Sequence, residues 1–199
     1  MRTTSKLASP LTWRQAKGVA LPAYYLLTDV RRLADPLPVL NRLPRGAAVI
    51  LRHYDINELE RLARRVIPRA HRLGLKVLLS SDIRLALKLK ADGVHLSEHQ
   101  TRLGPLRIQP HKPGFLLTVA AHSHLALWRA GKVSANAVLV SPIFATQSHP
   151  GANALGVLRA LALMNSSPVQ TIALGGLTSD TAKRLKSERL SGLAAIGGW

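Results

Sequence analysis

Two stretches near the end of the chain decide the fold: Val169-Gln-Thr-Ile-Ala-Leu-Gly-Gly-Leu177 and Gly192-Leu-Ala-Ala-Ile-Gly-Gly198. In each, an apolar run of strand length stops at a pair of glycines. Glycine lets the backbone approach a ligand closely, and backbone N–H groups that point the same way bind phosphate. The residues predicted to form this phosphate-binding corner are Gly175, Gly176, Ile196 and Gly197.

The alternation of apolar runs with helical periodicity extends back through the whole chain. Strands are predicted at 24–28, 48–51, 76–79, 93–96, 115–120, 137–140, 169–174 and 193–196. Helices are predicted at 37–43, 57–73, 82–89, 123–130, 155–164 and 179–186. Strands that alternate with helices form parallel sheets with right-handed crossovers, and eight of them close naturally into a barrel. We therefore predict an α/β fold, a TIM (β/α)8 barrel.

An open doubly wound sheet is the alternative architecture. It lacks support, because no GxGxxG motif follows the first predicted strand. In a TIM barrel, the loops after the seventh and eighth strands commonly bind phosphate. The two glycine pairs fall in these loops, so the barrel also accounts for their position.

The domain organisation is predicted to be simple. Residues 1–22 form an N-terminal extension, and residues 23–199 form a single barrel domain. No helix is predicted after the eighth strand, so the last outer helix of the barrel is missing. The apolar outer sides of the first and eighth strands then need another cover. Residues 11–22 could supply it, or a second copy of the chain in a homodimer, and both hypotheses stay open.

The strongest predicted helix spans 57–73. Its apolar residues recur at helical spacing: Leu59, Leu62, Ala63, Val66, Ile67 and Ala70. Asn57 is predicted as the N-cap, with Glu60 at the capping-box position, and Gly74 is predicted to end the helix.

Composition excludes several classes of protein. The chain has 199 residues, 47% of them apolar, which suits one globular core and not a disordered chain. The absence of cysteine excludes disulfides, thiolate metal sites and a cysteine nucleophile. No apolar run is long enough to cross a membrane, and the N-terminus lacks the apolar core of a secretory signal. We therefore expect a cytoplasmic protein without a membrane partner.

The net charge is the unusual feature of the composition. Lys and Arg number 28 against 10 Asp and Glu, which gives a formal charge of +18 that attracts anions. The densest group of basic residues is Arg61, Arg64, Arg65, Arg69 and Arg72. No RRM, KH or zinc-finger motif is present, and few aromatic residues could stack on bases. We expect a solvated basic surface and a phosphorylated small-molecule ligand, rather than nucleic acid.

Seven short motifs are similar, in order and spacing, to those of one known family. They are Tyr25-Leu-Leu-Thr-Asp29, Val49-Ile-Leu-Arg52, Ala91-Asp-Gly-Val-His-Leu96, Ala121-His-Ser123, Ser141-Pro-Ile-Phe-Ala-Thr146, Ile172-Ala-Leu-Gly-Gly-Leu177 and Gly192-Leu-Ala-Ala-Ile196. Together they resemble thiamine phosphate synthase and its relative, the thiazole tautomerase TenI. The resemblance implies a TIM barrel that handles a phosphorylated thiazole in thiamine biosynthesis.

The resemblance implies a Mg²⁺–pyrophosphate site in a synthase, but its carboxylates are displaced here. The position of one metal-binding Asp in the synthase pattern is occupied by Ser81, and Asp82 is the next residue along the chain. The other falls on Gln100, in the run Ser97-Glu-His-Gln100 that also contains Glu98. Because Mg²⁺ prefers carboxylate and phosphate oxygens, we expect no metal cofactor. If synthase activity is retained, Mg²⁺ is expected, with Asp82 and Glu98 as its candidate ligands.

The synthase pattern is also replaced at residues that would bind pyrophosphate. Ile50 and Tyr54 stand where the pattern has Gln and Lys, whereas its Arg is kept as Arg52. A further Lys of the pattern falls on a His, in a polar loop at the catalytic end of the barrel. The residues predicted to contact substrate from this loop are Thr146, Ser148 and His149.

The tautomerase relatives also lack the metal carboxylates, and their reaction moves a proton on the phosphorylated thiazole. A His of that family matches His122, and an ordinary histidine pKa near neutrality suits such a transfer. We predict His122 and Arg52 as catalytic residues, although His122 could instead only start a helix, and His95 as structural. Three functions stay open: a synthase with shifted carboxylates, a metal-independent tautomerase, and a phospholigand-binding barrel without catalysis.

Overall fold

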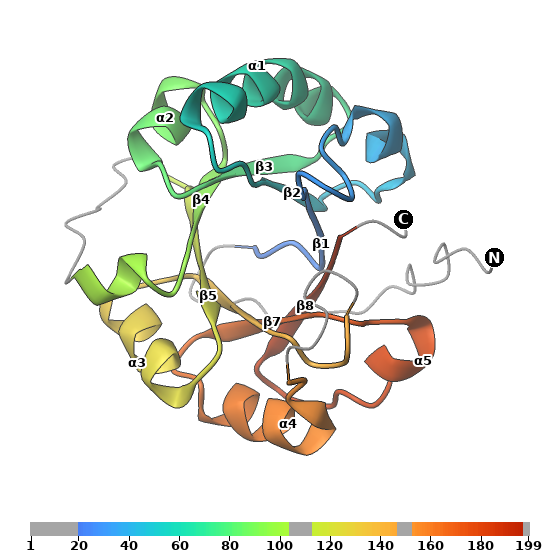
Figure 1. Ribbon diagram of the computed structural model, residues 1–199, viewed down its shortest axis with the longest axis vertical. Coiled ribbons are helices and arrows are strands. Elements are labelled where there is room, and N and C mark those ends of the chain that lie inside the picture. Colours follow the sequence, from blue (N-terminus) through green and yellow to red (C-terminus); the bar gives the residue numbers. More distant parts are fainter. Residues whose placement is uncertain (1–19, 104–112, 147–152, 197–199) are drawn as a thin grey trace.

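The computed structural model describes residues 20–103, 113–146 and 153–196, which form a closed barrel. Its strands are β1 (Tyr24–Leu27), β2 (Ala48–Leu51), β3 (Lys76–Ser80), β4 (Gly93–Leu96), β5 (Leu116–Ala121), β6 (Ala137–Val140), β7 (Gln170–Leu174) and β8 (Leu190–Ala195). Neighbouring strands are parallel, and the pairing of β8 with β1 closes the ring (Figure 1). The predicted TIM-barrel fold is confirmed.

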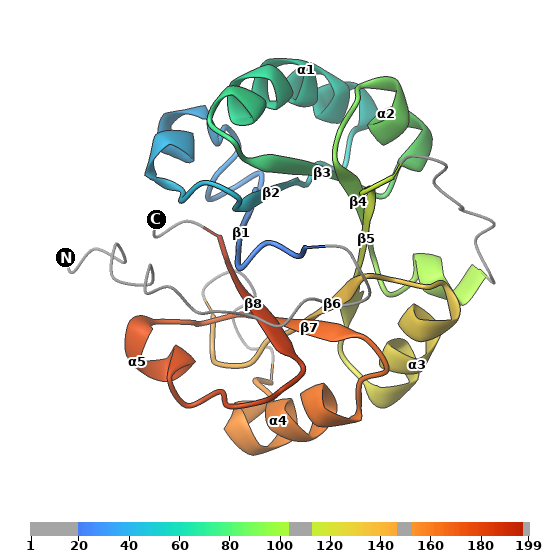
Figure 2. The ribbon, with the colours of Figure 1, turned by 180° about the vertical axis from the view of Figure 1, so that it is seen from behind.

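The helices lie around the outside of the strand ring (Figures 1 and 2). They are the 3₁₀-helices η1 (Leu37–Arg42) and η2 (Gln100–Leu103) and the α-helices α1 (Ile56–Arg72), α2 (Ile83–Lys88), α3 (His124–Lys132), α4 (Gly156–Ser166) and α5 (Ser179–Ala182). Each predicted helix is present, but α5 is shorter than expected, and β8 begins at Leu190 rather than at residue 193. No helix follows β8 in the described residues, which end at residue 196.

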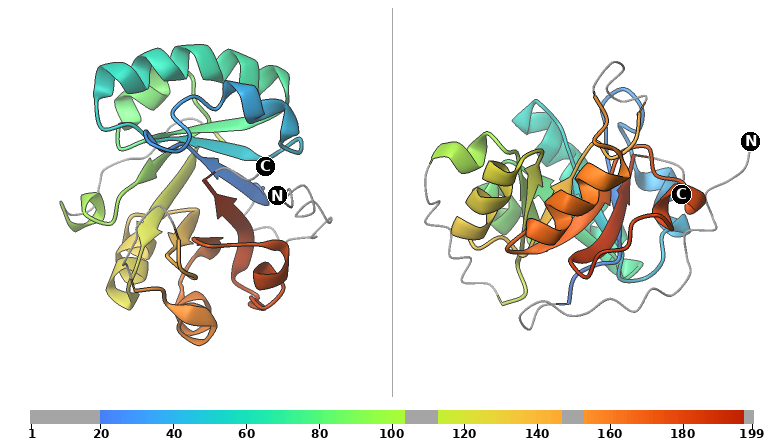
Figure 3. Two further views of the ribbon diagram at one scale, coloured as in Figure 1. Left: turned by 45° about the vertical axis from the view of Figure 1, so that its right-hand side comes forward. Right: turned by 90° about the horizontal axis from the view of Figure 1, so that it is seen from below.

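Alternate side chains of each strand point into the barrel, as the two-residue period of a strand requires. The inward side chains form one apolar cluster: Tyr25, Leu27, Ala48, Ile50, Leu78, Leu116, Ala137, Leu139, Ile172 and Ala194. Outward side chains such as Val49 and Leu79 join a larger cluster beneath the helices, where α1 lies along β2 and β3 (Figure 3). Because side chains fill the interior, the barrel is a packed core, and sites must be built at the strand ends.

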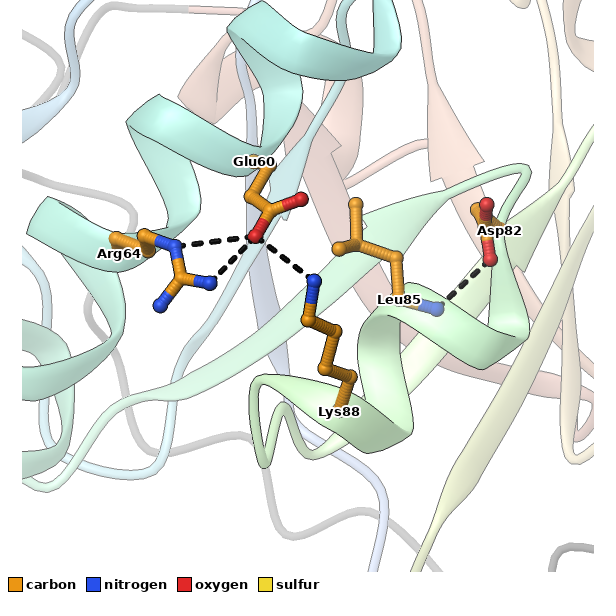
Figure 4. A network of polar contacts seen from close by, with 5 residues as sticks. All are labelled: Glu60, Arg64, Asp82, Leu85 and Lys88. Carbon is orange, nitrogen blue, oxygen red and sulfur yellow. Dashed lines mark hydrogen bonds and ion pairs between the residues drawn. The ribbon is translucent and has the colours of Figure 1, made fainter.

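The N-cap of α1 is Asp55, and the prediction of Asn57 is wrong. The Asp55 carboxylate accepts hydrogen bonds from the backbone N–H groups of Asn57 (2.8 Å) and Glu58 (2.9 Å). The bond from Glu58 is the main cause that lowers the pKa of the Asp55 carboxyl. Glu60 makes no capping box, because its carboxylate binds Arg64 and Lys88 instead (Figure 4). A charged cap also complements the positive end of the helix dipole, which an Asn side chain does less well.

The outer sides of β1 and β8 are covered at their apolar positions. Leu26 on β1 and Leu193 on β8 are 0% and 4% exposed, and Leu40 of η1 belongs to the same cluster. Only residues 20–22 of the predicted N-terminal extension are described. The proposals that residues 11–22 or a second copy cover these strands therefore stay predictions. Among the described helices, none has the length and apolar character needed to span a bilayer.

Candidate functional site

The predicted site residues gather at one rim of the barrel, because the carboxyl ends of parallel strands share a rim. Arg52 follows β2, Asp82 follows β3, Glu98 follows β4, His122 follows β5, Thr146 follows β6, Gly175 and Gly176 follow β7, and Ile196 follows β8. We name this rim the mouth. Thr146 and Ile196 are half-buried there. Ser148, His149 and Gly197, also predicted for the site, lie outside the described residues.

His122 is held between the ends of β5 and β6. Its Nδ1 lies 2.5 Å from the backbone carbonyl oxygen of Ser141, which can only accept, so Nδ1 carries a proton. The backbone N–H of His122 donates to the Glu98 carboxylate at 3.2 Å. His122 is exposed, and this tautomer leaves the Nε2 lone pair free to take up a proton. Two neighbours therefore orient a histidine that can act as an acid or a base.

Arg52 places a positive charge beside the mouth. Its backbone N–H donates to the Thr28 hydroxyl at 2.7 Å, and that hydroxyl lies 3.3 Å from the Arg52 carbonyl oxygen, which fixes the backbone at the end of β2. Arg52 is half-buried, and its guanidinium makes no ion pair or hydrogen bond with another described residue. A guanidinium without a carboxylate partner suits an anionic ligand.

His95 lies inside the barrel below the mouth. It is 7% exposed, and its Nδ1 lies 3.0 Å from Oγ1 of Thr118 on the neighbouring strand. Burial, with a smaller contribution from the Arg52 charge, lowers the pKa of His95 to about 3. His95 is therefore neutral at ordinary pH and places no charge beneath the site.

The loop after β7 requires glycine at both predicted positions. Gly175 and Gly176 have φ angles of +101° and +61°, which L side chains rarely adopt. A Cβ on Gly175 would lie 2.9 Å from the Cα of Pro142, and one on Gly176 would lie 2.4 Å from the carbonyl oxygen of Ala145. The two glycines thus let the loops after β6 and β7 pack directly on each other at the mouth. The sequence predicted glycine here for approach to a phosphate, and the packing of one loop on the other was not predicted.

Comparison with known families assigns the chain. Residues 24–198 match the family described as thiamine monophosphate synthase. The chain belongs to this family. The putative thiamine-phosphate synthase 2 of Aquifex aeolicus is 30% identical over 181 residues, which cover 88% of this chain and 96% of that protein. The thiamine-phosphate synthase of Bacillus velezensis is 24% identical over 185 residues, 88% of this chain and 82% of that one.

Solved structures show the same fold at lower identity. The thiamine phosphate pyrophosphorylase of Pyrococcus furiosus superposes with a TM-score of 0.66 at 18% identity, covering 87% of this chain and 85% of that one. FabK of Thermotoga maritima gives a TM-score of 0.67 at 11% identity, covering 89% of this chain and 58% of its own. At such identities these likenesses concern the barrel alone. The assignment to the thiamine monophosphate synthase family comes from the sequence match.

In this thiamine monophosphate synthase family member, the two carboxylates predicted as candidate Mg²⁺ ligands are bound to other groups of the protein. Asp82 is the N-cap of α2, and its carboxylate accepts from the Leu85 N–H at 2.8 Å (Figure 4). The Glu98 carboxylate is already bound to the Arg102 guanidinium at 3.2 Å and to the backbone of His122. Within the part of the chain that is described, no group of three His, Cys, Asp or Glu could hold a metal.

A hollow at the opposite end of the barrel was not predicted from the sequence. It has a volume of about 580 Å³ and is lined by residues that include Trp128, Lys132, Gln170 and Arg189. The Lys132 ammonium lies 5.1 Å from the centre of the Trp128 ring, and the four-residue spacing of this pair on α3 is a signal that the sequence contains. None of the predicted site residues lines this hollow.

Proposed function

We propose that this protein binds a phosphorylated thiazole at the mouth and acts in thiamine biosynthesis. Family membership and the names of the relatives support the pathway, and so does the position of Arg52, His122, Gly175 and Gly176 after parallel strands, whose carboxyl ends share one rim. Phosphate would meet the loop of Gly175 and Gly176, whose conformation lets the backbone approach an anion closely. Arg52 adds an unpaired positive charge for the same ligand.

The reaction we propose is a metal-independent proton shift on the bound thiazole, as in the tautomerase branch. The observation that carries it is the hydrogen bond from Nδ1 of His122 to the Ser141 carbonyl. This bond fixes the tautomer, so Nε2 takes a proton from one ring-bound position and returns it to another. The proton and the electron pair both stay within the thiazole–histidine pair, and no oxidant or reductant is needed.

A synthase is the second candidate, because the curated relatives carry that name. That reaction joins the thiazole to a pyrimidine whose pyrophosphate leaves, and it needs stabilisation of the departing anion. Arg52 could supply one positive charge, but the Asp82 and Glu98 carboxylates are engaged within the protein. The geometry therefore favours the proton shift.

The decisive experiment follows thiazole aromatisation and its uptake of solvent deuterium, with and without added pyrimidine pyrophosphate and Mg²⁺. We expect conversion without Mg²⁺, and a loss of roughly 10²-fold or more in His122→Ala, because a positioned acid–base group contributes about that much. The matched control is His124→Ala, since His124 is also exposed but bonds Ser166 on α4 at 2.9 Å. Its rate should stay within about twofold of the parent.

The outcomes separate the three candidate functions. Unchanged aromatisation in His122→Ala removes the proposed acid–base group. Formation of thiamine phosphate that depends on Mg²⁺ and on the pyrimidine substrate establishes the synthase instead. Saturable binding of thiazole phosphate with no conversion under any condition leaves a binding protein without catalysis.

A further inference from the structure

Gln100 ties together the loops that follow β3 and β4. Its Oε1 accepts hydrogen bonds from the backbone N–H of Ser97 at 3.0 Å and from the Ser97 hydroxyl at 3.2 Å. Its Nε2 donates to the backbone carbonyl oxygen of Ser81 at 2.9 Å. Both ends of one amide are therefore used, one on each loop.

The chemistry of the two partners fixes which way the amide points. A backbone N–H can only donate and a backbone carbonyl can only accept, so Oε1 must face Ser97 and Nε2 must face Ser81. Ser81 is itself held in a left-handed conformation, with a φ of +67°, and its N–H donates to the His95 carbonyl at 2.9 Å. The Ser81 carbonyl is thus aimed at Gln100 by the backbone, and a carboxylate at residue 100 would place two acceptors face to face.

The same loop carries Glu98, which binds the backbone of His122. Gln100 and Glu98 stand two residues apart, and Glu98 is further restrained by Arg102. The loop that carries Gln100 and Glu98 is therefore hydrogen-bonded on one side to Ser81, after β3, and on the other to His122, at the end of β5. Gln100 touches no reacting atom in this arrangement, so it is a positioning residue.

We infer that the Gln100 amide does the work of a divalent cation at this rim, and that the mouth is assembled without a metal. A cation would join the two loops by attracting oxygen atoms from both, whereas the amide joins them by donating to one and accepting from the other. This arrangement is neutral and complete. It suits a ligand with a single phosphate, bound through the glycine loop and Arg52, rather than a metal-bound pyrophosphate.

This inference rests on the proposed function only in taking the mouth as the ligand site. It is tested on the ligand-free protein, by thermal unfolding with a chelator and then with Mg²⁺ or Mn²⁺. At an ionic strength held constant with sodium chloride, the parent protein should show no change in Tm on addition of either ion. Gln100→Glu should lower the Tm in chelator by roughly 2–4 °C, because one hydrogen bond becomes a repulsion. Mg²⁺ should restore that loss, because a cation can then sit between the carboxylate and the Ser81 carbonyl.

Two further variants keep the test decisive. Gln100→Met removes all three side-chain hydrogen bonds without adding charge, so its Tm should fall and should not recover with Mg²⁺. Gln170→Glu makes the same charge change at the opposite end of the barrel and should show no response to Mg²⁺. A saturable rise in the Tm of the parent protein with Mg²⁺ overturns the inference, as does a Gln100→Glu variant as stable as the parent in chelator. If Gln100→Glu does not fold, the parent titration and Gln100→Met decide the matter.

These results are independent of the turnover experiment. If the Tm of the parent protein does not change with Mg²⁺ and the protein does not convert the thiazole, the proposed reaction is refuted and the role of Gln100 is retained. A protein that converts the thiazole through His122 but gains stability from Mg²⁺ supports the proposed reaction and refutes the role of Gln100.

Discussion

Single residues at the mouth owe their roles to backbone partners as much as to their own chemistry. His122 is exposed, yet the Ser141 carbonyl and the Glu98 carboxylate hold its ring and its backbone. Gln100 likewise serves two loops because a donor and an acceptor face it. A polar residue at the surface thus takes one defined orientation when rigid strand ends hold its hydrogen-bond partners in place.

His95 should make stability depend on pH. The unfolded chain binds a proton on this histidine below about pH 6.5, whereas the folded protein does so only near its pKa of about 3. Its contribution is therefore fully present above pH 6.5 and is lost as the pH falls towards 3, by up to about 1.4 kcal/mol per pH unit.

The measurement is urea unfolding at about pH 7.5 and about pH 5, on the parent protein and on His95→Gln. Gln can still hydrogen bond Thr118 but does not titrate, so the variant should lose less stability between the two pH values. Equal losses in both proteins would show that other groups cause the acid sensitivity.

At the scale of elements, α1 shows how a helix start is decided by geometry. Asp55 lies two residues before the predicted cap, Asn57, and its extended backbone, with φ −89° and ψ 129°, directs its side chain at the first free N–H groups of the helix. Asn57 lies inside the helix, where it donates its own N–H to Asp55. A neighbouring carboxylate therefore takes the position that an Asn would otherwise suit.

Removing this cap should destabilise the protein at a single helix end. Asp55→Ala should lower the Tm by roughly 2–4 °C, because two backbone N–H groups lose their acceptor. Asn57→Ala is the matched control and should change the Tm by less than about 1 °C. Calorimetry of the two variants settles the comparison, and the opposite ranking would restore Asn57 as the cap.

At the scale of the whole molecule, positive charge exceeds what the fold can pair. The excess of 28 basic over 10 acidic residues gives the +18 charge. Three of the five arginines of the basic group on α1 form ion pairs, two with Glu58 and Glu60 of the same helix and one with Asp35, which precedes η1. Arg69 hydrogen bonds to Asn41. Each of these exposed ion pairs contributes little to the free energy of unfolding. Most of the repulsion among the positive charges of the surface therefore remains.

Salt should therefore stabilise this protein. Sodium chloride screens the repulsion between like charges, so the Tm should rise as its concentration increases from low to moderate levels. Thermal unfolding at constant pH, repeated with sodium bromide in place of sodium chloride, tests whether the effect depends on the identity of the anion. A Tm that falls with both salts would show that the surface ion pairs outweigh the net charge.

Local patterning was sufficient to predict most of the architecture. Each strand was visible as a short apolar run between helical segments, and eight parallel strands have few ways to bury both faces. The shortened α5 and the earlier start of β8 were not predictable, because Leu190 pairs with Thr171 across a register shift between β7 and β8. A long-range pairing of this kind leaves no local signature.

The sequence by itself determined the barrel and the family, and it placed glycine pairs after the seventh and eighth strands. It also showed that Ser81 and Gln100 stand where metal-binding carboxylates were expected. Only the tertiary structure decided what those residues do, by bringing the Ser81 carbonyl and Ser97 to the two ends of one amide. Hydrogen-bond partners separated by 19 residues are set by strand register, and register belongs to the closed barrel rather than to any segment of the chain.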